Sequence, residues 1–256
     1  NQLVYSKPGY GSKDFAPVAS ATSGGYLMVA HPSLGANTLQ EFIALAKAKP
    51  GSIHLNMSTL STQASKTLAD RHQKAGLGYV AAPVLGRPAA ILDGKLLIVA
   101  AGKASDVEAA AVVFDKVSAQ HWNVGEDHSQ SILVKLGVNY NLIHALQAIG
   151  ESVALVESGG LDPNTFIEII THTAFTGAAY TGYGPMIVNR NYTPPGFSVA
   201  LGLKDVKLVE DAAAELDLKL PVASVLRGLF ESALNDPELR DLDWSAIAEL
   251  TRQRKL

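Results

Sequence analysis

The sequence predicts an α/β domain followed by an all-helical domain, and two observations carry this prediction. Between Ser52 and Gly125, short apolar runs alternate with segments of helical period, as strands and helices do in parallel α/β proteins. After Gly125, every apolar run has helical period. We therefore divide the 256 residues into an α/β domain at 1–125 and a helical domain at 126–256.

The strand-like runs of the first domain are short and apolar, and they lie at Tyr26–Ala30, Ile53–Met57, Tyr79–Val84, Leu96–Ala101 and His121–Val124. Helices are predicted from a cap at Asn37 or Thr38 to Pro50-Gly51, at about Thr62–Ala75, and from Ser105 to about Ala119. Asn1–Phe15 is rich in Gly, Ser and Lys and predicts an extended arm or loop.

The second domain begins with a long predicted helix at about Ser129–Glu157, which ends at Gly159-Gly160. Asp162-Pro163 then predicts the start of another helix, because Asp caps and Pro suits the first helical position. Further helices are predicted near Gly177–Asn189, Ser198–Leu216, Val222–Leu234 and Ser245–Gln253. The long helix spreads apolar side chains over more than one stripe, which predicts a homodimer.

Composition excludes several classes of protein. Hydrophobic residues make up 47% of the chain and charged residues 18%, which is incompatible with a disordered or fibrous protein. A net charge of −3 gives no basic stripe for nucleic acid. No apolar run approaches the roughly 18 residues that cross a bilayer, so we expect no membrane partner. Without cysteine, thiol catalysis is excluded. Because residue 1 is Asn, we expect a processed, truncated or engineered start.

Lys135 and Asn139 are the first candidates for chemistry, since their spacing of four places both on one face of the long helix. A partly buried lysine can protonate a carbonyl oxygen that gains charge, while the amide holds the same substrate. The alternative is a solvated helix face. If the pair acts together, Lys135 lies within hydrogen-bond reach of Asn139 and faces the loop around Gly86.

Polar groups at predicted strand ends are the second set of candidates, because ligands of open α/β sheets sit beyond the carboxyl ends of strands. Gly86 allows close backbone approach, and Arg87 can grip a carboxylate with two hydrogen bonds. The alternative is an ordinary turn with a surface arginine. Ser58 and Thr59 follow a strand with hydroxyls that can face a ligand; alternatively, they cap the Thr62 helix.

Two familiar site patterns are missing. The G-x-G-x-x-G fingerprint of dinucleotide binding is absent, since Gly9-Tyr10-Gly11 lacks a third glycine and a preceding apolar strand. The crowded His121, Glu126, Asp127 and His128 lack the spacing of a metal site, so we expect no metal.

From about Lys49 to the end, the chain resembles the β-hydroxyacid dehydrogenase family, relatives of the hydroxyisobutyrate and 6-phosphogluconate dehydrogenases. The matching segments occur in family order and are Lys49–His54, Asn56–Thr59, Ala82–Gly86, Gly94–Leu96, Leu133–Asn139 and Leu203–Asp205. The resemblance implies a Rossmann-like domain that binds NADP or NAD, here with an incomplete parallel sheet, and an all-α C-terminal domain. It also implies hydride transfer between nicotinamide and a small hydroxy acid or keto acid.

Carried over residue by residue, the resemblance implies that Lys135 is the catalytic lysine and that Asn139 holds the substrate. It places Gly86, Ser58 and Thr59 beside the substrate and Lys204 on the cofactor side. The segment Leu85–Pro88 departs from the family's usual Ser-Gly-Gly stretch, which leaves the class of substrate open. The related imine reductases replace the lysine, so its presence favours carbonyl or alcohol chemistry.

Residues 1–51 resemble a periplasmic tricarboxylate-type solute receptor instead, through Asp14–Val18, His31–Ser33 and Thr38–Gly51. The predicted protein is therefore a chimera: an oxidoreductase with an intact substrate half and weak or absent cofactor binding. The rival is a non-catalytic binding or assembly protein on the same scaffold. The larger portion implies a cytoplasmic location, and the smaller portion a periplasmic one.

Overall fold

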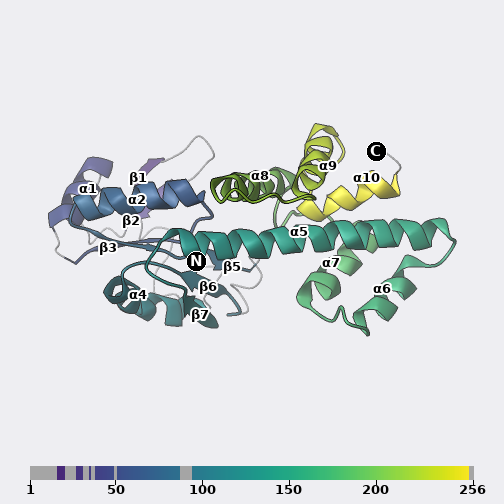
Figure 1. Ribbon diagram of the computed structural model, residues 1–256, viewed down its shortest axis with the longest axis horizontal. Helices are drawn as coiled ribbons and strands as arrows, with labels where there is room; N and C mark the ends of the chain where they lie inside the picture. Colours follow the sequence, from purple (N-terminus) through teal and green to yellow (C-terminus); the bar gives the residue numbers. More distant parts are fainter. Residues whose placement is uncertain are drawn as a thin grey trace. The chain divides into compact units, whose positions relative to one another are not determined.

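The computed structural model describes residues 16–20, 27–30, 35, 38–48, 51–86 and 94–253 (Figure 1). The chain forms two compact units, Asn1–Ile132 and Leu133–Leu256, so the division falls within the first turns of the long helix, shortly after Gly125. The prediction of a loop at Asn1–Phe15 lies outside the described residues, and so does Arg87.

The first unit contains short strands that pair in three groups. β1 (Ala16–Ser20) and β2 (Leu27–Ala30) are antiparallel. β3 (Ile53–Asn56) and β4 (Gly78–Ala81) are parallel. β6 (Leu97–Ala100) pairs with β5 (Val84–Leu85) antiparallel and with β7 (Gln120–Asn123) parallel. An antiparallel bridge between Ala81 and Ala101 connects the last two groups.

The fold class is confirmed, although the pairing is mixed rather than wholly parallel. The predicted strand Tyr79–Val84 divides into β4 and β5 around Ala82-Pro83, because proline has no N–H for a ladder hydrogen bond. The Pro83 carbonyl still accepts from Val99 N at 3.2 Å. β5 therefore runs back along β6, a direction that alternation of apolar segments does not specify.

The helices of this unit are α1 (Leu39–Ala48), α2 (Thr62–Lys74) and α4 (Ala104–Val117). Thr38 and Glu41 form a reciprocal capping box at α1, each side chain accepting from the other's backbone N at 3.2 Å. Ser61 caps α2 by accepting from Ala64 N at 3.1 Å. The core of the unit consists of buried apolar side chains from β4 and the residue after it, from β6 and from α4: Val80, Ala82, Ile98, Ala100, Val107, Ala110 and Phe114.

The second unit is helical, as predicted. Its longest element is α5 (Ser129–Ser158), which has 30 residues (Figure 1, teal). The others are α6 (Pro163–Thr171), α7 (Ala178–Val188), α8 (Val199–Glu215) and α9 (Ala223–Asn235). Asp162 caps α6, with Pro163 in the first turn as predicted. None of the described helices has the length and hydropathy needed to cross a bilayer.

The end of the chain differs in detail from its prediction. The segment predicted as one helix at Ser245–Gln253 begins as a 3₁₀ helix, η3 (Trp244–Ile247), and continues as α10 (Ala248–Arg252). The start is tight because the buried Asp243 carboxylate accepts from Ser245 N at 3.1 Å and Ser245 Oγ at 2.7 Å. This buried turn fixes α10 against α5, where Gly150 leaves no room for a Cβ beside Ala248.

Candidate functional site

A buried polar cluster joins α5 and α8 in the second unit. Asn139 Nδ2 donates to Asp205 Oδ2 at 2.5 Å, and both residues are buried. Lys204 Nζ lies 3.0 Å from Asp205 Oδ1, with 42% of its side chain exposed against 1% for Asp205. That oxygen receives no hydrogen bond from the described residues despite the ion pair, so it can accept from a further donor.

Lys135 lies one turn before Asn139 and is half-buried. Burial lowers its pKa; the negative charge of Asp205 opposes this effect, and the positive charge of Lys204 reinforces it. A lysine with a lowered pKa can exchange a proton nearer neutral pH than a solvated lysine does. The interpretation of this face as a simple solvated helix face is therefore a poor match for the structure.

The predicted hydrogen bond between Lys135 and Asn139 does not form among the described residues. The Asn139 amide nitrogen donates to Asp205, whose buried carboxylate is a strong acceptor. Lys135 and Gly86 belong to different units, so their proximity stays a prediction.

Ser58 and Thr59 lie in the turn between β3 and α2. Ser58 N donates to Asn56 Oδ1 at 2.9 Å, which makes a tight turn directly after the strand. The alternative role of these hydroxyls, as the cap of the Thr62 helix, is wrong because Ser61 is the cap. Ser58 is exposed and Thr59 half-exposed.

Gly86 directly follows β5 and is exposed. Its φ of 145° lies in a region that residues with a side chain rarely adopt, so this position requires glycine whether or not a ligand binds there. Arg87 lies outside the described residues, so its role stays a prediction.

The crowded segment from His121 to His128 serves the fold. His121 Nδ1 lies 3.6 Å from Asp115, and Asp127 accepts from Ser129 N at 2.9 Å at the start of α5. His128 Nε2 contacts the Tyr79 carbonyl at 2.9 Å. In the described part of the chain, no three metal-ligating side chains converge.

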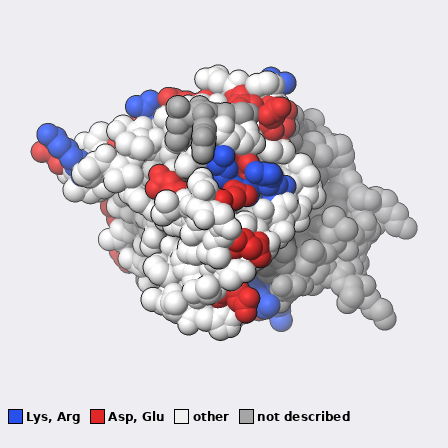
Figure 2. Space-filling model, turned by 90° about the vertical axis from the view of Figure 1, so that its right-hand side faces the viewer, with Lys and Arg blue, Asp and Glu red and all other residues white. Residues whose placement is uncertain are grey.

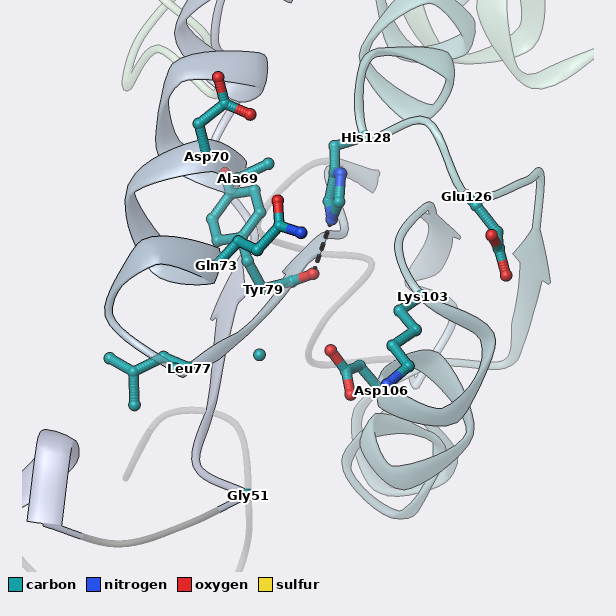
Figure 3. Close-up of a pocket in the computed structure, with 12 residues that line it drawn as sticks. Gly51, Ala69, Asp70, Gln73, Leu77, Tyr79, Lys103, Asp106, Glu126 and His128 are labelled. Carbon is teal, nitrogen blue, oxygen red and sulfur yellow. Dashed lines mark hydrogen bonds between the residues drawn. The ribbon is translucent and has the colours of Figure 1, made fainter.

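A pocket of about 590 Å³ lies in the first unit beside α2, and it does not contain the predicted site residues. It opens between Gln73 and Tyr79 on one side and Lys103 and Asp106 on the other, and the dashed line in Figure 3 marks the contact of His128 with the Tyr79 carbonyl.

Sequence comparison assigns both halves of the chain. The model of the NAD-binding domain of 6-phosphogluconate dehydrogenase matches residues 9–125. The model described as NAD-binding of NADP-dependent 3-hydroxyisobutyrate dehydrogenase matches residues 129–251. A Bacillus subtilis protein, uncharacterized oxidoreductase YfjR, is 37% identical over 195 residues, which are 76% of this chain and 68% of that protein. The chain belongs to the β-hydroxyacid dehydrogenase family.

Two further similar proteins are named for their substrates. Glyoxylate/succinic semialdehyde reductase 1 of Arabidopsis thaliana is 28% identical over 79% of this chain and 69% of its own length. The crystal structure of 3-hydroxyisobutyrate dehydrogenase from Salmonella typhimurium superposes with a TM-score of 0.74 at 26% identity, over 82% of this chain and 73% of that one. The chain thus spans about two thirds to three quarters of these relatives.

The family match corrects the predicted start of the resemblance to this family. Because the match to the β-hydroxyacid dehydrogenase family begins at residue 9, the resemblance is not confined to Lys49 onward. The receptor-like assignment of residues 1–51 gains no support from these comparisons. β1 and β2 are antiparallel strands of this segment, whereas the first strands of a dinucleotide-binding unit are parallel.

NADP or NAD is the cofactor of the β-hydroxyacid dehydrogenase family. Among the described residues, no glycine-rich turn of the kind that usually holds the pyrophosphate joins a strand to a helix N-terminus. The turn after β3 ends at Ser61, whose side chain caps α2. The turn after β6 contains a single glycine, Gly102, where an added Cβ would meet the Tyr79 carbonyl.

Asp205 belongs to the buried polar cluster of α5 and α8, and the sequence alone predicted no role for it. It lies on the buried stripe of α8, beside Leu203 and Val206, and is fully buried. A carboxylate on an otherwise apolar helix stripe requires a partner, and this pattern is the signal that points to it. Lys204 pairs with Asp205, and its predicted place on the cofactor side stays a prediction.

Proposed function

We propose that the chain is an NAD(P)-dependent oxidoreductase that interconverts a small hydroxy acid and its carbonyl form, with Lys135 moving the proton. The observation that carries the proposal is the lowered pKa of Lys135 beside the buried Asn139–Asp205 pair. Nicotinamide supplies or takes the hydride when it is bound.

In the reducing direction, the Lys135 ammonium stabilises the charge that grows on the carbonyl oxygen and then donates its proton to the alkoxide. In the oxidising direction, the neutral amine takes the proton from the hydroxyl. Asp205 keeps Asn139 oriented and favours the charged form of Lys135, while Lys204 disfavours it. Ser58, Thr59, Gly86 and Arg87 are proposed to contact the substrate.

Relatives indicate small acids or aldehydes as substrates, since their names include glyoxylate, succinic semialdehyde and L-threonate. We therefore expect turnover in a panel of these compounds and 3-hydroxyisobutyrate, each with NAD(H) and NADP(H). A cytoplasmic location is proposed from the family and stays untested.

We expect weak dinucleotide binding, because the sequence lacks the G-x-G-x-x-G fingerprint whose backbone N–H groups normally face the pyrophosphate. A fluorescence titration with NADH and NADPH measures this. Protein purified without additions should carry no dinucleotide, and a tightly retained one would contradict the prediction. Silence in both titrations together with no turnover favours the rival, a non-catalytic binding or assembly protein.

The pH dependence of oxidation should report on Lys135. The rate rises with pH, is half-maximal at the pKa of Lys135 and reaches a plateau above it, because only the neutral amine accepts the proton. Lys204→Gln removes a positive charge that lowers this pKa, so the rising limb should move to higher pH. Asp205→Asn removes the negative charge that raises it, so the limb should move to lower pH. Profiles of kcat/KM for the three proteins measure both shifts, and shifts of the same sign would contradict the assignment.

We also propose a homodimer through α5. Val134 and Val138 are 40% and 42% exposed on this helix, and a largely apolar groove of about 440 Å³ runs beside them. It is lined by residues of α5 and α7: Val138, Asn141, Leu142, His144, Ala145, Ala148, Ala179 and Tyr180. On the face in Figure 2, acidic and basic side chains are scattered among uncharged ones.

Light scattering at micromolar concentration should therefore give the mass of a dimer. Val138→Glu places a charge in the groove and should shift the protein to monomer, because a desolvated unpaired carboxylate is costly. Val112→Glu adds the same charge at a valine of α4 that is 67% exposed and should leave the dimer intact. A monomer mass for the unaltered protein would overturn this assembly.

A further inference from the structure

A polar layer lies between α2 and the strands β3 and β4, where an α/β unit usually packs apolar side chains. His54 and Asn56 alternate along β3 and therefore point to the same side of the sheet. Tyr79 is the register partner of His54 on β4. His72 of α2 contacts this layer through a 2.8 Å hydrogen bond between His72 Nε2 and His54 Nδ1.

Tyr79 is the centre of the layer. Its side chain is buried, and its ring centroid lies 4.9 Å from His72, 5.3 Å from His128 and 5.4 Å from His54. Burial raises the pKa of Tyr79, while hydrogen bonds with Asn56 and Ser65 oppose the rise. A raised pKa keeps the phenol neutral at physiological pH, so its oxygen both accepts and donates. In Figure 3 the Tyr79 ring lies beside Ala69 and Gln73 of α2.

Asn56 connects this buried tyrosine to the turn of the candidate site. Asn56 Nδ2 donates to the Tyr79 hydroxyl at 3.1 Å, and Asn56 Oδ1 accepts from Ser58 N at 2.9 Å. The Asn56 carbonyl accepts from Ala82 N at 2.7 Å, which fixes the end of β3 against the neighbouring strand. The amide plane is therefore held at both of its polar ends, and Ser58 is held with it.

We propose that Asn56 and Tyr79 are positioning residues, which hold the β3–α2 turn so that Ser58 and Thr59 meet the substrate. This inference rests on the proposed function, because the turn is assigned to the substrate there. The buried tyrosine orients the amide, the amide oxygen holds the Ser58 backbone, and the backbone sets the direction of the two hydroxyls.

Three variants separate the parts of this chain of contacts. Tyr79→Phe keeps the ring and removes the hydroxyl. Asn56→Leu removes both hydrogen bonds of the amide. Asn56→Asp keeps an oxygen for Ser58 N, and its second oxygen accepts from the Tyr79 hydroxyl once that group turns to donate. Asn123→Leu is the matched control, because Asn123 Oδ1 accepts from Gly125 N at 3.1 Å and makes the same kind of turn after β7.

Amide hydrogen exchange at Ser58 gives a readout that does not depend on activity. Exchange should accelerate about 2- to 10-fold in Tyr79→Phe and at least as much in Asn56→Leu, which is the fold-change expected for one hydrogen bond. Asn56→Asp and Asn123→Leu should match the unaltered protein at Ser58. Unchanged exchange in Asn56→Leu would overturn the proposal.

Steady-state kinetics test whether the β3–α2 turn contributes to substrate binding. KM for the hydroxy acid should rise about 2- to 10-fold in Tyr79→Phe and Asn56→Leu with little change in kcat, since the turn binds substrate and Lys135 moves the proton. Asn56→Asp should restore KM, which a purely structural defect would not. Normal turnover with an unaltered KM in Asn56→Leu overturns the positioning role alone. No turnover in the unaltered protein overturns the proposed function itself.

Discussion

Lys135→Met should lower turnover by about 10²–10⁴-fold, the range for loss of a general acid or base. Methionine keeps the length of the side chain and its packing on α5 but has no proton to give. In the proposed reaction the ammonium also stabilises the alkoxide, so this stabilisation is lost together with the proton. The melting temperature should stay almost unchanged, because Lys135 forms no ion pair with the described residues.

Two further variants make this result specific. Lys135→Arg should restore little activity, because a guanidinium stays charged and is a poor proton donor. Lys207→Met removes a lysine of α8 whose side chain is 53% exposed, and should keep turnover near that of the unaltered protein. Full activity in Lys135→Met would refute the assigned role and return this residue to the helix surface.

The sequence predicts the helical half of the fold well, because its signals are local. Gly159-Gly160 predicts the end of one helix and Asp162-Pro163 the start of the next, and the structure has both within a residue of the prediction. Strand direction is not a local property, so the reversal of β5 at Pro83 was not predicted. The boundary between the two units lies inside α5, after Ile132, and the sequence does not indicate it because the helical period continues on both sides.

The candidate site could be predicted only in part. Helical spacing places Lys135 and Asn139 together, but the partner of Asn139 comes from α8, 66 residues away. Spacing cannot show such a contact. The turn at Ser58 was predicted as a polar strand end, whereas the buried tyrosine that contacts Asn56 lies on another strand and carries no sequence motif.

The second large effect concerns stability of the helical unit. The Glu249 carboxylate is almost wholly buried: Oε1 accepts from the Tyr192 hydroxyl at 2.7 Å and from Arg252 Nη1 at 2.8 Å. Arg252 is equally buried and forms two bonds to Glu157 at 2.9 and 3.0 Å. These contacts fasten α10 to α5 and to the segment after α7. Burial and the charge of Glu249 raise the pKa of Tyr192, so its hydroxyl remains a donor.

Glu249→Leu should therefore lower the free energy of unfolding by about 3–5 kcal/mol, the cost of removing one partner of a buried ion pair. The loss arises because Arg252 and Tyr192 stay buried with fewer acceptors, rather than from lost packing, since leucine is similar in volume. Adding Arg252→Met to this variant should cost less than the two single changes summed, because the uncompensated buried charge is removed.

Urea denaturation followed by circular dichroism measures these changes. Glu168→Leu removes an exposed carboxylate from α6 and should shift stability by no more than about 0.5 kcal/mol. A loss below about 1 kcal/mol in Glu249→Leu would mean that water reaches Arg252 once the carboxylate is gone, since a solvated guanidinium has no desolvation penalty left to repay. The size of the loss thus measures how closely α10 is held against α5, and with it the support for the helix that carries Lys135.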